Sequence, residues 1–175
     1  MQTRSIYADT LFDAGSLEEL EDHAKYIVQV NFKMMQLKIC KAKPGLFSTA
    51  QRFPSVEYQV YKGDFEVGDV IKIAEQYYVE EQDGQQTLVH YGNYMPSDVG
   101  REYLMFFDNP PENSERWKDT YTPLCWIGAV SSDKRQTWSV AGVDNMTNEG
   151  LNLDTGDSSL YRQFYKDVIE KYMNG

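Results

Sequence analysis

The stretch from Val56 to Ile73 says more about the fold of this chain than any other. Every second residue from Val56 to Val60 is apolar, which is typical of a strand with one buried face. Turn residues follow at Lys62–Asp64 and Gly68–Asp69, and an apolar run resumes at Val70. We expect two paired antiparallel strands joined by this glycine-containing link, as in a small β-barrel or β-sandwich.

A helix is expected near each end of the chain. Ser16 to Glu19 forms a capping box, in which Ser16 accepts a hydrogen bond from the Glu19 amide while the Glu19 carboxylate reaches back to the cap. The apolar spacing after it predicts a short helix over about 17–25. A longer helix is predicted over about 159–173, with a wide apolar stripe that should pack on the β-structure.

The remaining elements follow from alternating apolar residues and from turn residues. Strands are expected over 26–33, 56–61, 70–79, 87–91, 101–107, 124–130 and 137–143, the last two as a hairpin. A one-residue bulge after Met34 would let the first strand bend around a barrel. Residues 41–54 contain two prolines and a glycine and are expected to form a loop.

These elements predict a mainly β fold. We expect an OB-like, closed or partly open antiparallel barrel with a short N-terminal helix and a C-terminal amphipathic helix. Because no repeat or linker interrupts the sequence, residues 1–175 are expected to form a single domain. Within it, about 16–142 would be the barrel core, 143–158 an acidic loop and 159–173 the last helix.

Charge restricts the partners of such a domain. The formal net charge is −10, which disfavours nucleic acids and anionic membrane surfaces because both carry negative charge. No run of 18 apolar residues exists, so we expect no membrane span. The first residues also lack the apolar core of a signal peptide, so the protein is either cytosolic or begins after a removed export signal or lipid anchor.

The two cysteines, Cys40 and Cys125, leave the compartment open. Both lie in apolar, strand-like segments, where buried free thiols are common. The alternative is a single disulfide, which would stabilise the fold by about 4 kcal/mol and favour an exported protein. Two cysteines are too few for a structural zinc site.

Several blocks occur along the chain in the order Ser16–Leu20, Ala24–Val28, Val56–Ile73, Gly100–Phe106 and Tyr121–Pro123. Their order resembles that of small secreted or lipid-anchored bacterial modules with an OB-like barrel, related in fold to the tissue inhibitors of metalloproteinases (TIMP-like). The resemblance covers about 16–142 and implies an extracellular or cell-surface setting, with the targeting peptide outside this sequence. It implies no catalytic residues. The free N-terminal cysteine of the animal inhibitors has no counterpart, because the chain begins with Met1.

Catalytic and metal-binding patterns are weak. Asp154-Thr155-Gly156 matches the aspartic-protease triplet, but the few residues after it leave no room for the rest of a lobe. The oxygen-rich segment Asp144–Asp157 departs from the EF-hand spacing, so we expect a hydrated loop rather than a calcium site. Glu19 and His23 form an i, i+4 pair that fits a solvated helix face better than a metal site. We therefore expect no cofactor and no metal.

Aromatic residues are the best candidates for a functional surface, because rings stack on sugars and anchor protein interfaces. The candidates are Tyr77, Tyr78, Tyr91, Tyr94, Trp117, Tyr121 and Trp126. The function predicted from them is a non-enzymatic binding or protein-interaction module at a bacterial cell surface, with an unknown protein or glycan as its ligand. One rival is a small hydrolase with its site around His90. The other is a cytoplasmic acidic inhibitor of a basic partner.

Overall fold

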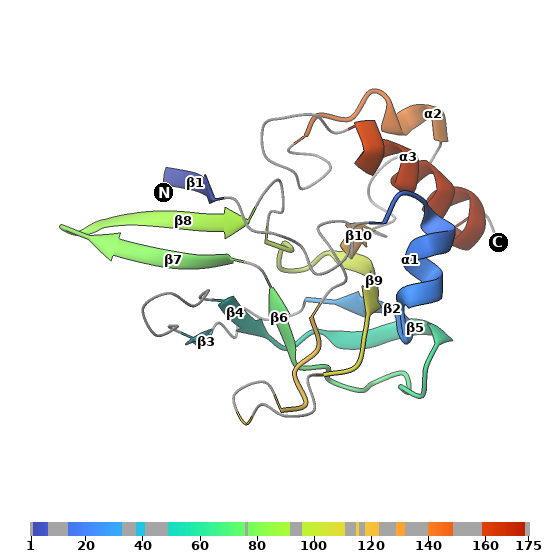
Figure 1. The fold of residues 1–175 in the computed structure, drawn as a ribbon, viewed down its shortest axis with the longest axis horizontal. Helices are drawn as coiled ribbons and strands as arrows, with labels where there is room; N and C mark the ends of the chain where they lie inside the picture. Colours follow the sequence, from blue (N-terminus) through green and yellow to red (C-terminus); the bar gives the residue numbers. More distant parts are fainter. Residues whose placement is uncertain are drawn as a thin grey trace.

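The computed structural model describes eleven stretches of the chain. They are residues 2–6, 14–32, 38–40, 49–75, 77–91, 96–110, 115, 118–122, 129–131, 140–148 and 159–173. The fold is mainly β, with three small sheets and with helices gathered at one side (Figure 1). None of the described helices is long and apolar enough to cross a bilayer.

A four-stranded antiparallel sheet forms the centre of the molecule. Its order is β10 (Ala129–Ser131), β9 (Glu102–Phe107), β2 (Tyr26–Asn31) and β5 (Ser55–Lys62). The β2–β5 pairing contains two register shifts, between Ile27 and Val28 and between Val28 and Val30. Such irregularities bend a strand. The bulge expected after Met34 lies outside the described residues.

Two three-stranded sheets flank the central one. The first pairs β3 (Lys38–Cys40), β4 (Thr49–Arg52) and β6 (Ile73–Glu75), all antiparallel. The second has the order β1 (Gln2–Ile6), β8 (Gln85–Tyr91) and β7 (Tyr77–Gln82), and its β1 runs parallel to β8. Asp83 and Gly84 join β7 to β8 with φ angles of 54° and 77°, as a tight hairpin turn requires. This hairpin projects from the body as an arm (Figure 1).

The helices cover one face of the central sheet. They are α1 (Leu17–His23), the short α2 (Val140–Val143) and α3 (Ser159–Val168), which continues as a π-helical turn over Ile169–Met173. At the start of α1, the Ser16 hydroxyl accepts from the Glu19 amide at 3.2 Å, as predicted. The Glu19 carboxylate accepts from the Gly15 amide at 2.7 Å, one residue earlier than in a regular capping box.

Both faces of the central strands are buried, and each contributes to a separate hydrophobic cluster. Ile27, Leu104 and Phe106 pack with α1 and α3 on one side. On the other side, the cluster contains Val28, Val30, Phe32, Val56, Ile71, Ile73, Tyr103, Met105 and Phe107. Burial on both faces explains why the sequence of β9 is almost wholly apolar.

The pairing expected between residues 56–61 and 70–79 is wrong in detail. β5 pairs with β2, whereas β6 pairs with β4 and β7 pairs with β8. The link folds back on the start of β5, with a bridge from Ser55 to Val70 and a 2.8 Å bond from the Val56 amide to the Asp69 carbonyl. The link is too long for a two-residue hairpin turn, so it does not impose a continuous ladder.

Three further expectations need correction. The loop predicted over 41–54 contains β4, whose sequence Thr-Ala-Gln-Arg has little strand propensity but which is paired on both edges. Within the strand predicted over 137–143, the described residues Val140–Val143 form α2 instead, and Arg162 donates to the carbonyl of Val143. The N-terminal strand β1 is not predicted from the sequence, because its five residues alone carry no periodic signal.

Two isolated bridges extend the sheets: Ser55 of β5 pairs with Val70, and Ile73 of β6 pairs with Tyr121. Among the described residues these links do not close the sheets into a barrel.

Candidate functional site

The seven aromatic candidates lie in different parts of the chain. Tyr77 is buried on β7, and the next residue, Tyr78, is half-buried with its hydroxyl donating to Glu80 at 3.1 Å. Tyr91 ends β8, and its side chain lies outside the described part of the structure, as do Tyr94, Trp117 and Trp126. Tyr121 is half-buried and belongs to another group of rings. Their binding role remains a prediction.

Tyr121 forms a compact trio with Tyr26 and Phe65, which we call the aromatic patch. The ring centroids lie 5.0 Å apart for Tyr26 and Phe65, and 5.3 Å apart for each of the other two pairs. The ring planes are inclined to one another by 51°, 83° and 69°. All three rings are half-buried, so each packs on the core and keeps some surface in contact with solvent.

The backbone holds the aromatic patch from three directions. Tyr26 begins β2, and Phe65 lies in the link after β5. Tyr121 lies on a third segment and forms backbone hydrogen bonds with Lys72 and Ala74. The Tyr121 amide donates to the Lys72 carbonyl at 2.9 Å, and its carbonyl accepts from the Ala74 amide at 2.8 Å. The Tyr26 hydroxyl donates to the Asn109 side chain at 3.1 Å.

Gly63 lies directly against the aromatic patch. Its φ is +101°, and a Cβ at this position would overlap the Tyr26 ring. Glycine is therefore required here for two independent reasons, the backbone conformation and the close approach of the ring.

The electrostatic environment of the aromatic patch is negative. Partial burial raises the pKa of Tyr121, and the Tyr26 hydroxyl raises it further. The carboxylates of Asp64 and Asp119 add to this effect, because negative charge opposes the formation of a phenolate. Both aspartates are exposed, and Asp119 has a φ of 55°, which is uncommon for a residue with a side chain.

Apolar side chains are exposed on the same link that carries Phe65. Val67 and Val70 are 61% and 65% exposed, the two largest values among the exposed apolar side chains of the described residues. Glu66 precedes Val67 and Asp69 precedes Val70, and both carboxylates are exposed. The link thus offers apolar surface with carboxylates around it.

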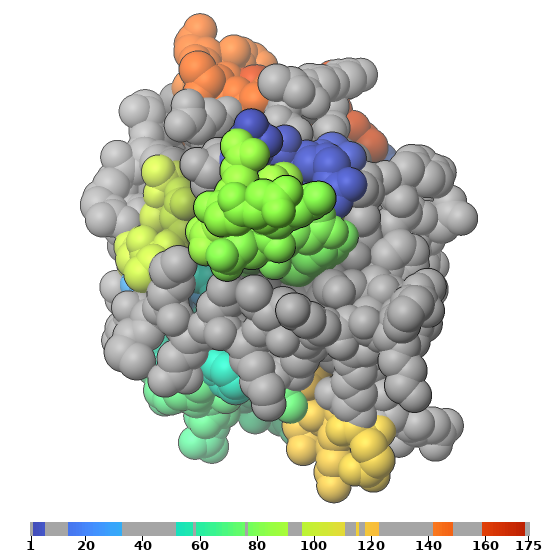
Figure 2. Space-filling view, turned by 90° about the vertical axis from the view of Figure 1, so that its left-hand side faces the viewer, coloured from blue at the N-terminus to red at the C-terminus, as the bar shows by residue number. Residues whose placement is uncertain are grey.

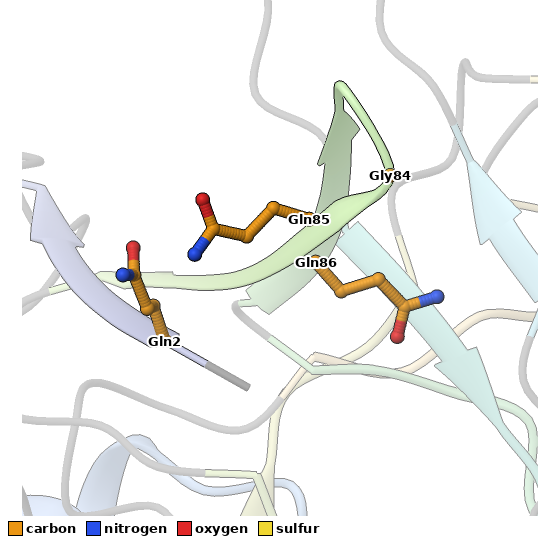
Figure 3. Close-up of a pocket in the computed structure, with 4 residues that line it drawn as sticks. All are labelled: Gln2, Gly84, Gln85 and Gln86. Atoms are coloured by element: carbon orange, nitrogen blue, oxygen red, sulfur yellow. The ribbon is translucent and has the colours of Figure 1, made fainter.

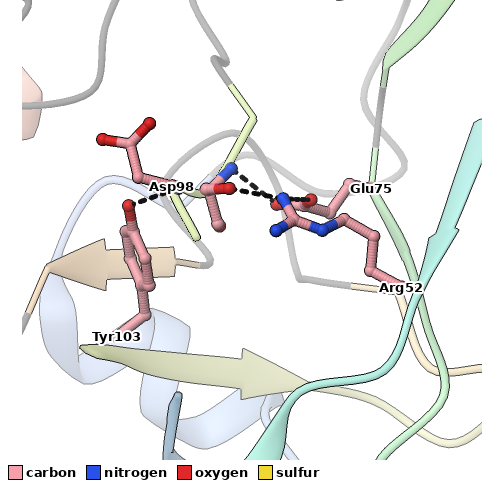
Figure 4. Close-up of polar contacts among 5 residues, drawn as sticks. Arg52, Glu75, Asp98 and Tyr103 are labelled. Carbon is pink, nitrogen blue, oxygen red and sulfur yellow. Dashed lines mark hydrogen bonds and ion pairs between the residues drawn. The ribbon is translucent and has the colours of Figure 1, made fainter. Parts of the chain in front are cut away.

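A second polar group lies in the interior. Arg52 donates to Glu75 at 2.7 Å and to the carbonyl of Ser97, and the Ser97 amide donates to Glu75 at 3.0 Å (Figure 4). The Arg52 guanidinium also lies 4.3 Å from the centroid of the Phe32 ring. This ion pair connects β4, which carries Arg52, to β6, which carries Glu75. Both side chains are almost wholly buried, so the pair is not open to a ligand.

The Tyr103 side chain continues this interior group. Its hydroxyl accepts from the Asp98 amide at 2.8 Å (Figure 4). Its ring packs edge-on against Phe32, with the ring centroids 5.5 Å apart. Burial raises the pKa of Tyr103. Ser97 and Asp98 are thereby fixed between β4, β6 and β9.

His90, the centre of the hydrolase hypothesis, is fully buried on β8. A hydrolase would need the ring to line an open cleft that a substrate can enter. The burial of His90 therefore does not favour that hypothesis.

A hollow lies on the hairpin arm. It has a volume of about 430 Å³ and is lined by Gln2, Gly84, Gln85 and Gln86. Gln2 and Gln85 extend toward each other, whereas Gln86 points to the opposite side (Figure 3). The arm, coloured green, lies near the centre of the face that Figure 2 turns to the viewer. With neither an aromatic ring nor a charged group in its lining, this hollow is a poorer site than the aromatic patch.

Metal chemistry finds no support in the described part of the chain. No group of three or more His, Cys, Asp or Glu side chains is placed there to hold an ion. Asp144, the first residue of the oxygen-rich segment Asp144–Asp157, pairs with Lys166 at 2.6 Å. The Nδ1 of His23 lies 3.1 Å from the Glu19 carbonyl. Residues 149–158, with the Asp154-Thr155-Gly156 triplet, and the side chains of Cys40 and Cys125 lie outside the described residues.

Tyr26, Phe65 and Gly63 are not among the candidates that the sequence suggests. The sequence pattern places Tyr26 on the apolar face of a strand and Phe65 beside a turn. The sequence does contain one signal for Phe65, since an aromatic ring inside a polar, glycine-containing link has no obvious role in the turn itself.

Comparison with known protein families, curated proteins and solved structures finds no match for this chain.

Proposed function

We propose that this chain is a non-enzymatic protein-interaction module whose contact surface is the aromatic patch. The observation that carries the proposal is the trio of half-buried rings flanked by Asp64 and Asp119. Half-buried tyrosines are typical anchors of protein interfaces, because they bury much area and lose little side-chain freedom. The exposed Val67 and Val70 would add apolar contact on the same link.

The partner that fits this surface is a protein with a basic face. The net charge of −10 attracts such a partner over long range, and the carboxylates around the patch complement it at close range. An acidic inhibitor of a basic protein would use the same surface. It differs from a cell-surface module only in its compartment.

An OB-like barrel at the bacterial cell surface is the architecture and setting that we propose for this module. The order of the sequence blocks and the mainly antiparallel, β-rich fold support it. Intact mass with and without reductant tests the setting, because a disulfide between Cys40 and Cys125 favours export whereas two free thiols favour the cytoplasm.

Affinity capture from the source cells tests the function. We expect the wild-type protein and the control Tyr61→Ala to retain a basic protein at low salt and to release it at high salt. The double variant Phe65→Ala/Tyr121→Ala should fail to retain it. Tyr61 is a suitable control because it is a half-buried tyrosine that packs on the helix-side cluster and not in the patch.

A second experiment tests the alternative that the protein is a hydrolase with its site around His90. Turnover of a panel of esters, peptides and glycans, abolished by His90→Ala in a folded variant, would refute the proposal. Equal capture by the wild type and by the double variant would also refute it, because the patch would then make no contribution.

A further inference from the structure

We propose that the hairpin arm is a second docking surface, where the open edge of β7 pairs with an extended, basic segment of another protein. This surface is separate from the aromatic patch, so the inference goes beyond the proposed function. Three observations carry it: the position of β7 in its sheet, the exposure of its outer half, and the charge of the arm.

β7 is an edge strand in the described part of the chain. The sheet order is β1, β8 and β7, so β8 pairs with one side of β7 and no described strand pairs with the other. In an antiparallel pair only alternate residues exchange backbone hydrogen bonds with their partners. The two-residue turn of the arm is closed by the hydrogen-bonded pair Gln82 and Gln85. By this alternation, Val79 and Glu81 direct their backbone amides and carbonyls to the open edge.

The outer half of β7 is accessible, whereas its inner half is fixed. Residues 80–82 are exposed, and the arm projects from the body (Figure 1). At the base of the arm, Tyr77 packs with Leu88 in a small buried cluster. The edge is therefore ordered before a ligand arrives, and in strand addition the entropy cost of ordering then falls mainly on the added segment.

The charge of the arm favours a basic occupant. Glu80, Glu81 and Asp83 are exposed, and Arg4 of β1 pairs with Glu80 at 2.6 Å. Arg52, on the neighbouring strand β4, is buried in its own ion pair and does not reach the surface. Glu81 has no ion-pair partner among the described residues, so its carboxylate can accept a cation of the partner.

A second copy of this chain is a poorer occupant than a basic segment. The β7 strand of another copy would place Glu80 and Glu81 against the same carboxylates, and like charges destabilise a strand pair. The sheet itself contains a segment of the favoured kind. β1 is extended, has Arg4 at its centre, and lies along β8 with Arg4 against Glu80. A basic segment on β7 would extend the same sheet by one strand on its other side.

The experiment is an NMR titration of the full chain with a capped peptide of alternating lysine and threonine, equal in length to β7. The reference is the same peptide with glutamate in place of lysine. We expect saturable shifts at the backbone amides of Val79 and Glu81 with the lysine peptide only, because these amides gain hydrogen bonds. Shifts that do not saturate, shifts confined to other parts of the chain, or equal affinity for both peptides would overturn the inference.

Methylated peptides test whether the backbone makes the contact. In antiparallel pairing, the peptide residues opposite Val79 and Glu81 exchange hydrogen bonds with them, and attraction to Glu81 places lysines there. N-methylation of the lysine residues should therefore weaken binding by at least about tenfold. N-methylation of the threonine residues keeps the same charge and should leave the affinity nearly unchanged. Equal affinity of the two methylated peptides would refute strand addition.

A charge variant tests the role of Glu81. Glu81→Gln should weaken binding of the lysine peptide by about two- to fivefold, since one exposed ion pair is lost. Glu18→Gln is the matched control, because it removes the same charge from an exposed position on α1 and should leave the affinity unchanged. Unchanged affinity in Glu81→Gln would contradict the charge argument and with it the inference.

The double variant Phe65→Ala/Tyr121→Ala distinguishes this inference from the proposed function. A folded double variant should bind the lysine peptide as the wild type does, although it loses the captured protein. Loss of the peptide as well would place the peptide on the aromatic patch and overturn the inference, while the proposed function would stand. A dimer of the chain alone that protects the Val79 and Glu81 amides from hydrogen exchange would show that a second copy occupies the edge, which would also refute the inference.

Discussion

At the scale of single residues, Gly63 shows how one position without a side chain shapes the aromatic patch. Gly63→Ala should destabilise the fold by about 2–4 kcal/mol, because it combines a strained backbone with overlap of the Tyr26 ring. Gly68→Ala is the matched control, since Gly68 has the same φ of +101° and a Cβ there would meet nothing within 4 Å. It should cost about 1–2 kcal/mol. Urea unfolding measures both, and equal losses would show that the ring contact contributes nothing.

The buried ion pair of Arg52 and Glu75 gives a second prediction at this scale. Arg52→Met should destabilise by about 3–5 kcal/mol, because it leaves the Glu75 carboxylate buried without its cation. Replacing both residues, as Arg52→Met/Glu75→Leu, should recover most of that loss.

The exposed pair of Arg4 and Glu80 serves as the control for that prediction. Its atoms are equally close, at 2.6 Å, but the side chains are 52% and 45% exposed. Arg4→Met should therefore change the free energy of unfolding by less than about 1 kcal/mol. A similar loss at both pairs, measured by urea unfolding, would mean that burial does not determine the effect.

At the scale of elements, the C-terminal π-helical turn is held to α1 by one carboxylate. Glu21 accepts from the Tyr172 hydroxyl and from Lys171 Nζ at 2.5 Å. Glu21→Ala should destabilise by about 1–2 kcal/mol and speed hydrogen exchange over 169–173 more than elsewhere. Asp22→Ala, which removes the neighbouring exposed carboxylate, should leave that exchange unchanged. Unaltered exchange in Glu21→Ala would refute this attachment.

The elements that the sequence predicts well are those whose pattern is local. The capping box at Ser16 marks the start of α1, and the alternation in Tyr26–Asn31 marks β2, because each signal lies within a few neighbouring residues. The partner of a strand is not local information. The run predicted over 70–79 is divided between β6 and β7, which pair with different strands.

The same limit applies to the candidate site. Tyr121 can be singled out as an aromatic residue, but its neighbours Tyr26 and Phe65 lie 95 and 56 positions earlier in the chain. Only the fold brings the three together. The flanking Asp119 has a positive φ, and no sequence pattern reveals this conformation.

At the scale of the whole molecule, negative charge is distributed over both projecting surfaces. The arm carries Glu80, Glu81 and Asp83, and the link beside the aromatic patch carries Asp64, Glu66 and Asp69, all of them exposed. A basic partner is therefore attracted to the molecule from several directions, whereas the aromatic rings determine where it docks. Charge should govern the rate of association, and the rings the rate of dissociation.

The buried phenol of Tyr77 makes the stability of the whole fold depend on pH at high pH. Burial, followed by the charge of Glu75, raises the pKa of Tyr77 from 10.0 to about 12, although Arg52 opposes this shift. Above pH 10 the unfolded chain releases the Tyr77 proton while the folded chain retains it, so rising pH favours unfolding. The contribution is fully present below pH 10 and is lost by about pH 12, and it amounts to about 2–3 kcal/mol. The free energy of unfolding of the wild type should therefore fall relative to that of Tyr77→Phe across this interval. A difference between the two proteins that stays constant from pH 8 to about pH 12 would show that Tyr77 titrates alike in both states.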